Sequence, residues 1–219
     1  GVTSIYSGTF YNCTALESIT IPASVKTIGQ NSFKGCKALK TITFDEACEL
    51  TSIGNTAFEG SGITSITLPK NNTANTTFGT TIFKDCVDLK SAYLPSSLAG
   101  LNNCFLGCSL EVLEMESTGD ASSDAFKVDT ELGFVMNGDE NIIQLYFGTA
   151  ETVTIPAGVT DIAANAFANN TSLKKIILPA SLNNIGAEAF MESESLSGEI
   201  IIPESVEVIG DCAFGGTSL

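Results

Sequence analysis

The sequence predicts a repeat solenoid, in which similar coils stack on one another along a common axis. A motif of about 23 residues, roughly I-P-x-S-V-x-x-I-G-x-x-A-F-x-x-C-x-x-L-x-x-I-x-I, recurs along the chain. Residues 21–44 are a regular copy, and residues 156–178 and 179–202 are others. Each copy carries an apolar face that so short a unit cannot bury alone, so the copies must stack. We therefore expect about eight coils that share one elongated core.

The segment L-x-x-I-x-I of each copy has the period of a β-strand. Its last two apolar residues flank a mostly polar one, as Ile42 and Phe44 flank Thr43, and such alternation is typical of a half-buried strand. Proline follows the segment in most copies, for example Pro22. Because proline has no N–H to donate, it ends the strand and starts a turn. Stacked strands of this kind predict a parallel sheet along one side of the solenoid.

The other part of each copy, S-V-x-x-I-G-x-x-A-F, predicts a turn followed by one helical turn on the convex side. Glycine after the Ile, as at Gly29 and Gly54, suits a turn that tolerates a side chain poorly. The A-F-x-x-C stretch is too short for a stable isolated helix. One phenylalanine per coil should stack into a ladder of rings. This ladder comprises Phe10, Phe33, Phe58, Phe83, Phe105, Phe167, Phe190 and Phe214.

Two regions interrupt the repeat. Residues 70–81 (KNNTANTTFGTT) are rich in Asn and Thr and should form a loop. Residues 116–152 exceed one coil by about 15 residues, and within them 133–136 and 142–147 predict a β-hairpin across the Asn137-Gly138 turn. We expect residues 1–219 to form a single solenoid with 116–152 as an irregular insert. We also expect a fragment of a longer protein, whose signal, anchor and end caps lie outside it.

The composition excludes several classes of function. The chain has no histidine and no arginine, and its ten cationic residues are all lysine. Without histidine, Ser-His-Asp and Cys-His mechanisms and most zinc sites are excluded. Without arginine, the chain lacks the usual bidentate ligand of phosphate and guanine. A net charge of −15 also repels nucleic acid and anionic membranes.

The acidic residues are unevenly distributed. Residues 1–110 hold seven acidic residues and seven lysines, whereas residues 111–219 hold eighteen acidic residues and three lysines. This surplus serves solubility in the simplest interpretation. A second interpretation is an acidic end that attracts a cationic partner or binds calcium weakly.

Four of the seven cysteines recur at one position of the repeat: Cys13, Cys36, Cys86 and Cys108. A recurring position places them in a column of small buried residues, one per coil. Neighbouring coils lie about 4.8 Å apart, so a disulfide is within reach. The odd total favours reduced thiols instead. The sequence has no C-x-x-C pair, and we expect no metal site and no cofactor.

The pattern I-P-x-S-V-x-x-I-G-x-x-A-F-x-x-C resembles the BspA-like (Treponema pallidum type) leucine-rich repeat family, over nearly the whole chain. The resemblance implies a leucine-rich repeat fold, a right-handed β/α superhelix, with a hairpin-containing variant coil at the insert. It also implies a bacterial cell-surface or secreted protein that attaches to host proteins and other cells. The chain departs from the pattern by shortening at 59–62 and 107–110 and by one extra residue near Gly198.

The candidate binding face is the concave surface of the predicted sheet. The residues between the buried strand positions are mostly Ser and Thr, which strand propensity explains without a ligand. Apolar exceptions on such a surface can mark an interaction site. We expect the site to comprise these exceptions and their charged neighbours. They are Tyr93, Glu114, Lys175, Ile177, Glu199 and Ile201.

The resulting hypothesis is a non-catalytic adhesion module that binds extracellular or host-cell proteins at the cell surface. A passive spacer between other domains is the alternative. An enzyme that acts on glycans with paired carboxylates, such as Asp120 with Asp124 or Asp139 with Glu140, is disfavoured because these acids lie in predicted loops. We expect no nucleic-acid partner and no membrane insertion. Self-association through the repeat ends is an additional expectation, because a bare terminal coil exposes strand edges.

Overall fold

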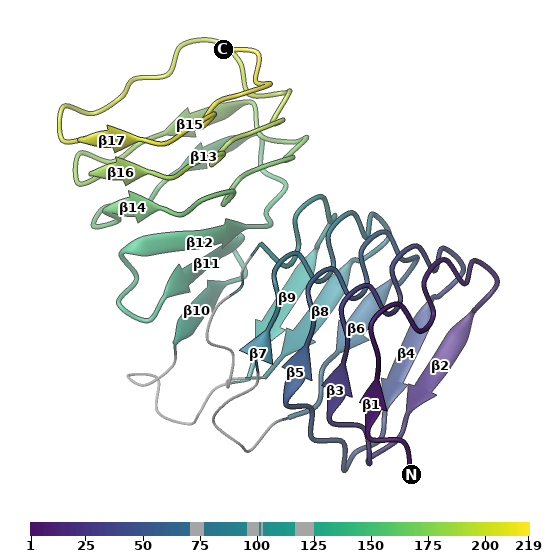
Figure 1. Cartoon of the computed structure of the whole chain (residues 1–219). Coiled ribbons are helices and arrows are strands. Elements are labelled where there is room, and N and C mark those ends of the chain that lie inside the picture. The colour runs from purple at the N-terminus through teal and green to yellow at the C-terminus, as the bar shows by residue number, and fades with distance from the viewer. Residues whose placement is uncertain (71–76, 96–100, 102, 117–124) are drawn as a thin grey trace. The chain divides into compact units, whose positions relative to one another are not determined.

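The computed structural model describes residues 1–70, 77–95, 101, 103–116 and 125–219 (Figure 1). The chain is a β-solenoid of about eight turns with a repeat of about 23 residues. It divides into two compact units, Gly1–Ala125 (unit 1) and Phe126–Leu219 (unit 2). A single domain over residues 1–219 stays a prediction. Residues 117–124 of the expected insert lie outside the described part.

Unit 1 stacks its coils through two rows of parallel strands. The predicted L-x-x-I-x-I strands form one row, in two sheets: β2 (Ser18–Ile21) with β4 (Thr41–Phe44), and β6 (Ser65–Thr67), β8 (Ser91–Leu94) and β9 (Val112–Met115). Two-residue strands at the V-x-x-I-G segment, where we expected only a turn, form the other row. These are β1 (Ser4–Ile5), β3 (Thr27–Ile28), β5 (Ser52–Ile53) and β7 (Thr77–Phe78).

The strand register keeps apolar residues in columns. Ser18 pairs with Thr41 and Ile19 with Ile42, so equivalent residues of successive coils lie side by side. Ile42 is buried while Thr41 and Thr43 are exposed. The parallel sheet with alternating burial is therefore confirmed. Residues 71–76 of the expected loop lie outside the described part. The prediction is wrong for Thr77–Phe78, which pairs with Ser52–Ile53 as a strand.

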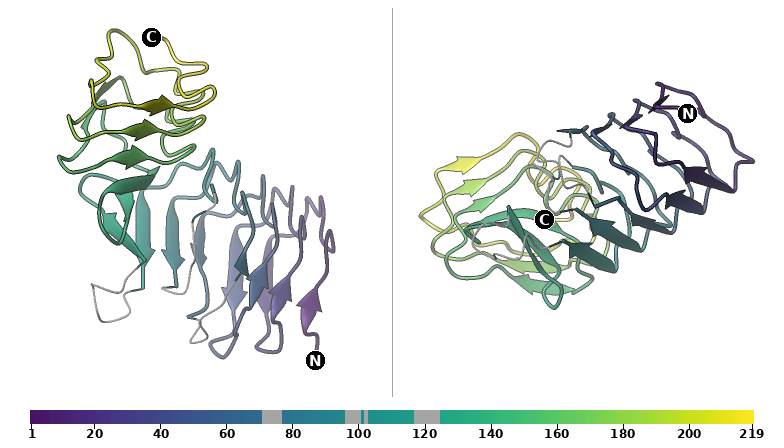
Figure 2. Two further views of the ribbon diagram at one scale, coloured as in Figure 1. Left: turned by 60° about the vertical axis from the view of Figure 1, so that its left-hand side comes forward. Right: turned by 90° about the horizontal axis from the view of Figure 1, so that it is seen from below.

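Unit 2 begins with an antiparallel segment and continues as parallel coils. In its larger sheet, β10 (Phe126–Asp129), β11 (Phe134–Asn137) and β12 (Ile142–Tyr146) pair antiparallel in succession, and β12 then pairs parallel with β14 (Asp161–Ile162). The stack goes on through β16 (Asn184–Ile185) and β17 (Val208–Ile209), which remain stacked in the views of Figure 2. A second sheet pairs β13 (Thr152–Thr154) with β15 (Lys175–Ile177).

No described residue is helical, so the helical turn expected on the convex side is wrong. In its place, alternate N–H groups donate to the next coil: Asn31 to the Asn55 carbonyl at 3.1 Å, and Phe33 to the Ala57 carbonyl at 2.7 Å. In an α-helix these N–H groups would instead donate to the carbonyls of residues four positions earlier in the chain. The turn therefore forms a third ladder between coils.

Residues in the left-handed conformation, with positive φ, interrupt this turn, so that it does not continue as a helix. In each regular coil, the residues two before and two after the ring residue have positive φ, for example Asn31 (φ 55°) and Gly35 (φ 74°) around Phe33. Glycine adopts this conformation without strain and Asn and Asp adopt it more readily than most residues, although Thr56 and Glu188 adopt it here as well. The positive φ values interrupt the helical path on both sides of the ring residue, and the N–H groups of every second residue, Asn31, Phe33 and Gly35, donate to the same neighbouring coil.

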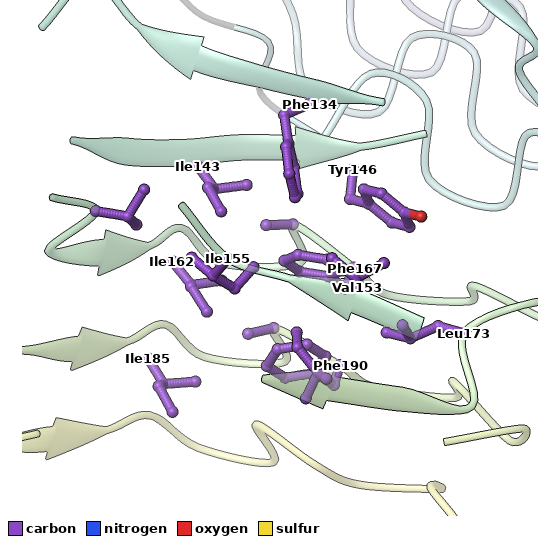
Figure 3. Close-up of a cluster of buried hydrophobic side chains, with 14 of the residues drawn as sticks. Phe134, Ile143, Tyr146, Val153, Ile155, Ile162, Phe167, Leu173, Ile185 and Phe190 are labelled. Atoms are coloured by element: carbon purple, nitrogen blue, oxygen red, sulfur yellow. The ribbon is translucent and has the colours of Figure 1, made fainter. Parts of the chain in front are cut away.

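The ring ladder is confirmed in both units. In unit 1 the Phe33 ring lies 5.0 Å from that of Phe10 and 5.1 Å from that of Phe58, with nearly parallel planes. In unit 2 the Phe167 ring lies 4.8 Å from that of Phe190, and Figure 3 shows both beside a column of isoleucines. Tyr146, which we did not expect in the ladder, stacks on Phe167 at 4.9 Å.

Candidate functional site

The predicted site residues of unit 1 lie on the outward face of the sheet β6–β8–β9. Tyr93 of β8 pairs with Thr67 of β6 on one side and with Glu114 of β9 on the other. Inward-facing Ala92 and Leu113 are buried and fix this orientation. Tyr93 is half-buried and Glu114 is exposed. The structure thus brings these two candidates together, at the end of a column that is otherwise threonine.

The predicted site residues of unit 2 lie on and beside β15. Lys175 and Ile177 face outward from this strand, around the buried Ile176. Ile177 is 45% exposed, and Ile201 in the following coil is 75% exposed. Both side chains are far more exposed than that of the core-facing Ile176, which is buried. These two isoleucines are the apolar part of the candidate face in this unit.

The ladder that carries this face stops after β15. Residues 199–202 form no strand, although Glu199 and Ile201 occupy the next coil and are exposed. Gly198, the extra residue noted in the sequence, has φ 86° and precedes this break. The register that aligns Lys175 with Thr152 and Ile177 with Thr154 is therefore not continued to Glu199 and Ile201.

The six candidates thus divide between the two units. Tyr93 and Glu114 belong to unit 1, whereas Lys175, Ile177, Glu199 and Ile201 belong to unit 2. They form two candidate faces, one on each unit. The hydroxyl-rich columns of unit 1 and the apolar pair of unit 2 give these faces different chemistry.

Ion pairs join neighbouring coils and leave unit 2 with unneutralised acids. Lys34 contacts Glu59 at 2.8 Å, and the hydrogen bond to this carboxylate raises the Lys34 pKa. Near the unit 2 face, Lys174 contacts Glu151 at 2.6 Å. Lys175 has no ion-pair partner among the residues that the structure describes. It is the cation on this face that remains available to a partner.

The cysteine column has a role that sequence reasoning missed. Thiols donate to the carbonyl of the ring residue in the preceding coil: Cys36 to Phe10, and Cys86 to Phe58, each at 3.0 Å. In unit 2 the Ser193 hydroxyl takes this position and donates to the Phe167 carbonyl at 2.7 Å. Replacement of cysteine by serine at this one position, visible in the sequence, was the signal for a hydrogen-bond donor.

Burial makes the inner thiols poor nucleophiles. It raises the pKa of Cys86 to about 11 and that of Cys104 to about 12, against an ordinary value of 9.0. The thiolate is the reactive form of cysteine, so these side chains remain neutral and unreactive near pH 7. We therefore interpret them as structural residues of the core.

The carboxylate pairs weighed for an enzyme gain no support. Asp120 and Asp124 lie outside the described residues. Glu140 is exposed and contacts Lys127 at 2.6 Å, so this carboxylate lies in water and its charge is balanced by an ion pair. Among the described residues, no three His, Cys, Asp or Glu side chains are grouped to hold a metal ion. Within that same part of the chain, no helix has the length and apolarity to cross a membrane.

Comparison with known proteins identifies a family and supports the fold. Residues 3–132 and 145–219 match the BspA type leucine rich repeat region, in six copies. No curated protein matches the chain. The crystal structure of the pneumococcal vaccine antigen PcpA is 27% identical, with a TM-score of 0.73 over 98% of this chain and 60% of that one.

Two further crystal structures share the fold at lower identity. A leucine rich cell surface protein from Faecalibacterium prausnitzii is 23% identical, with a TM-score of 0.60 over 99% of this chain and 49% of that one. A leucine-rich repeat protein from Eubacterium ventriosum is 19% identical, with a TM-score of 0.57 over 100% of this chain and 81% of that one. The chain therefore spans less than two thirds of PcpA and of the Faecalibacterium protein.

Proposed function

The chain belongs to the BspA-type leucine-rich repeat family, and on that premise we propose that it is a non-catalytic protein-binding module of a cell-surface or secreted protein. Its similarity to PcpA, a pneumococcal vaccine antigen, supports the cell-surface or secreted location. The partners would be extracellular or host-cell proteins. Stacked coils present an extended surface rather than an enclosed pocket, which suits this role.

The exposed isoleucines of unit 2 are the observation that carries the proposal. Ile177, which pairs with Thr154 of the coil before, and Ile201 in the following coil leave apolar side chains exposed. When a partner covers apolar surface of this kind, the complex is stabilised by about 25 cal/mol for each Å² removed from water. Lys175 and Glu199 would add a polar rim, which favours the correct partner orientation more than it adds affinity.

A passive spacer is the second candidate, and the outward face of unit 1 favours it. That face is dominated by Ser and Thr side chains, which need no partner to remain soluble. Ion pairs such as Lys34–Glu59 also tie its coils to one another rather than to a ligand. A spacer would need only this stacking.

The two candidates are separated by immobilising the chain and measuring binding of a panel of extracellular-matrix and serum proteins by biolayer interferometry. A binding module retains at least one of them, and the double variant Ile177→Asp/Ile201→Asp should abolish that signal with a native circular dichroism spectrum. Ala164→Asp/Ala187→Asp is the matched control, because both alanines are exposed residues of unit 2 away from β15. Unchanged binding by the isoleucine variant would exclude this face, and an empty panel would favour the spacer.

A further inference from the structure

Successive coils approach closely at the residue that follows the inward-facing Ile of the short strands, a position we call the seat. A Cβ atom at Gly29 would lie 2.5 Å from the backbone N of Ser7, and one at Gly54 would lie 2.5 Å from that of Gln30. Real Cβ atoms essentially never come within 3.0 Å of another heavy atom. The same holds for the other seat glycines of regular coils, Gly79, Gly186 and Gly210.

The seat glycines are needed for space rather than for an unusual backbone conformation. None of them is among the residues with positive φ. Their N–H groups donate straight back to the coil before, Gly29 to the Ile5 carbonyl and Gly54 to the Ile28 carbonyl, both at 2.7 Å. This hydrogen bond holds the two backbones together, so a side chain on the seat would separate them.

Among the described seats that lie above another coil, one residue has a side chain, and the segment beneath it differs. Ala163 donates its N–H to the Ile143 carbonyl of β12 at 2.9 Å. β12 continues as a strand past Ile143 to Tyr146, with a register shift against β11 after Ile143 (Figure 1), and its ring residue Tyr146 comes three positions after Ile143, whereas a regular coil takes five. The bend that brings the backbone of a regular coil under the next seat is missing there. The seat therefore excludes a side chain only above a bent coil.

In the first coil the seat residue is Tyr6. The pairing of Ser4 with Thr27 and of Ile5 with Ile28 makes it the counterpart of Gly29. Since the seat faces away from the following coil, the Tyr6 side chain, 78% exposed, projects from the N-terminal face of unit 1. A bent coil stacked on that face in the regular register would place its backbone where the Tyr6 Cβ lies.

We propose that Tyr6 closes the N-terminal face of unit 1 to a further bent coil of this repeat, whether that coil comes from the same chain or from a second copy. The face would admit a straight strand of the kind that β12 forms beneath Ala163. Self-association through the repeat ends would then not use the first coil in the regular register. Stacking would be restricted to one direction by a single side chain.

The test duplicates residues 1–23 in front of Gly1, which preserves the 23-residue register between Ser4 and Thr27. A docked extra coil would donate its copies of the Gly8, Phe10 and Asn12 N–H groups to unit 1, as those groups now donate to the carbonyls of the second coil. With Tyr6 in the original first coil, these added amides should exchange as fast as in an unfolded peptide. With Tyr6→Gly in that coil, these amides should exchange more slowly than in the unfolded peptide, by a factor of about ten or more.

Tyr11→Gly in the original first coil is the matched control, because Tyr11 is a second exposed aromatic residue of the same coil, outside the seat. It should leave the added coil unprotected. Protection of the added coil next to Tyr6 would overturn the proposal. The proposal would also be overturned if the added coil stayed unprotected in the Tyr6→Gly chain while the amides of the second and third coils kept their native exchange rates. Tyr6 would then not be the barrier.

Discussion

Replacing Phe33 by alanine tests whether the ring ladder holds the coils together. Its ring is fully buried between those of Phe10 and Phe58, at centroid distances of 5.0 and 5.1 Å. Hydrogen-bonded ladders fix the coils on both sides, so the neighbours cannot collapse into the space that the ring leaves. Phe→Ala substitutions in such cores cost about 3–5 kcal/mol of unfolding free energy, and we expect a value in this range.

Phe10→Ala in the same ladder is the control. The Phe10 ring ends the stack, is only partly buried and has Phe33 as its one neighbour in the ladder. Because an aromatic pair contributes about 0.5–1.5 kcal/mol beyond its burial, this substitution should cost at least about 1 kcal/mol less than Phe33→Ala.

Urea denaturation followed by circular dichroism measures both costs. Amide exchange of residues 31–35 then shows whether the loss is local, since coils of a solenoid interact mainly with their neighbours. Equal costs for the two variants would contradict the packing argument. A loss for Phe33→Ala no larger than that of an ordinary surface substitution, about 0.5 kcal/mol, would refute the ladder itself.

Three further predictions concern the hydrogen bonds, the seat and the thiols. Ser193→Ala should lower the free energy of unfolding, measured in urea, by about 1 kcal/mol, because the Phe167 carbonyl then accepts only a longer backbone hydrogen bond. Ser193→Cys should restore most of the lost free energy. Gly54→Ala should destabilise more than Gly60→Ala in that assay, since Gly60 has positive φ but open space around it; the reverse order would disprove the close approach at the seat. A thiol reagent at pH 8 should label the exposed Cys13 and spare native Cys104. Folding raises the pKa of Cys104 from 9.0 to about 12, so its contribution to the free energy of unfolding is fully present below pH 9 and is lost as the pH rises toward 12. A melting temperature that falls over this range would report the loss.

The features that repeat at a fixed spacing could be predicted from the sequence. The alternation of Ile42 and Phe44 around Thr43 reports burial directly, and it placed strand β4 correctly. Recurrence of one phenylalanine per copy likewise required a stack of rings. The exposed side chain of Ile177 followed from the same alternation, because its neighbour Ile176 had to face the core.

The features that depend on backbone conformation could not be predicted this way. Residues as different as Asn31, Thr56 and Glu188 all have positive φ, so no residue type marked the turn. The two-residue strands are too short to show alternation. Tyr146 joined the ladder unnoticed because the insert shortens the spacing between its ring and Ile143. The coil beyond β15 loses its strand through one extra residue, whose effect on the candidate face depends on geometry.

The parallel ladders of each unit join one coil to the next, and this has a mechanical consequence for a protein held by its ends. Tension along the stack loads the hydrogen bonds of the outermost coil first, so coils peel away one at a time. Each coil occupies about 4.8 Å of the stack, yet it releases about 75–80 Å of extended chain when it comes off. A stack of this design therefore lengthens in steps under flow while the coils behind the rupture stay folded.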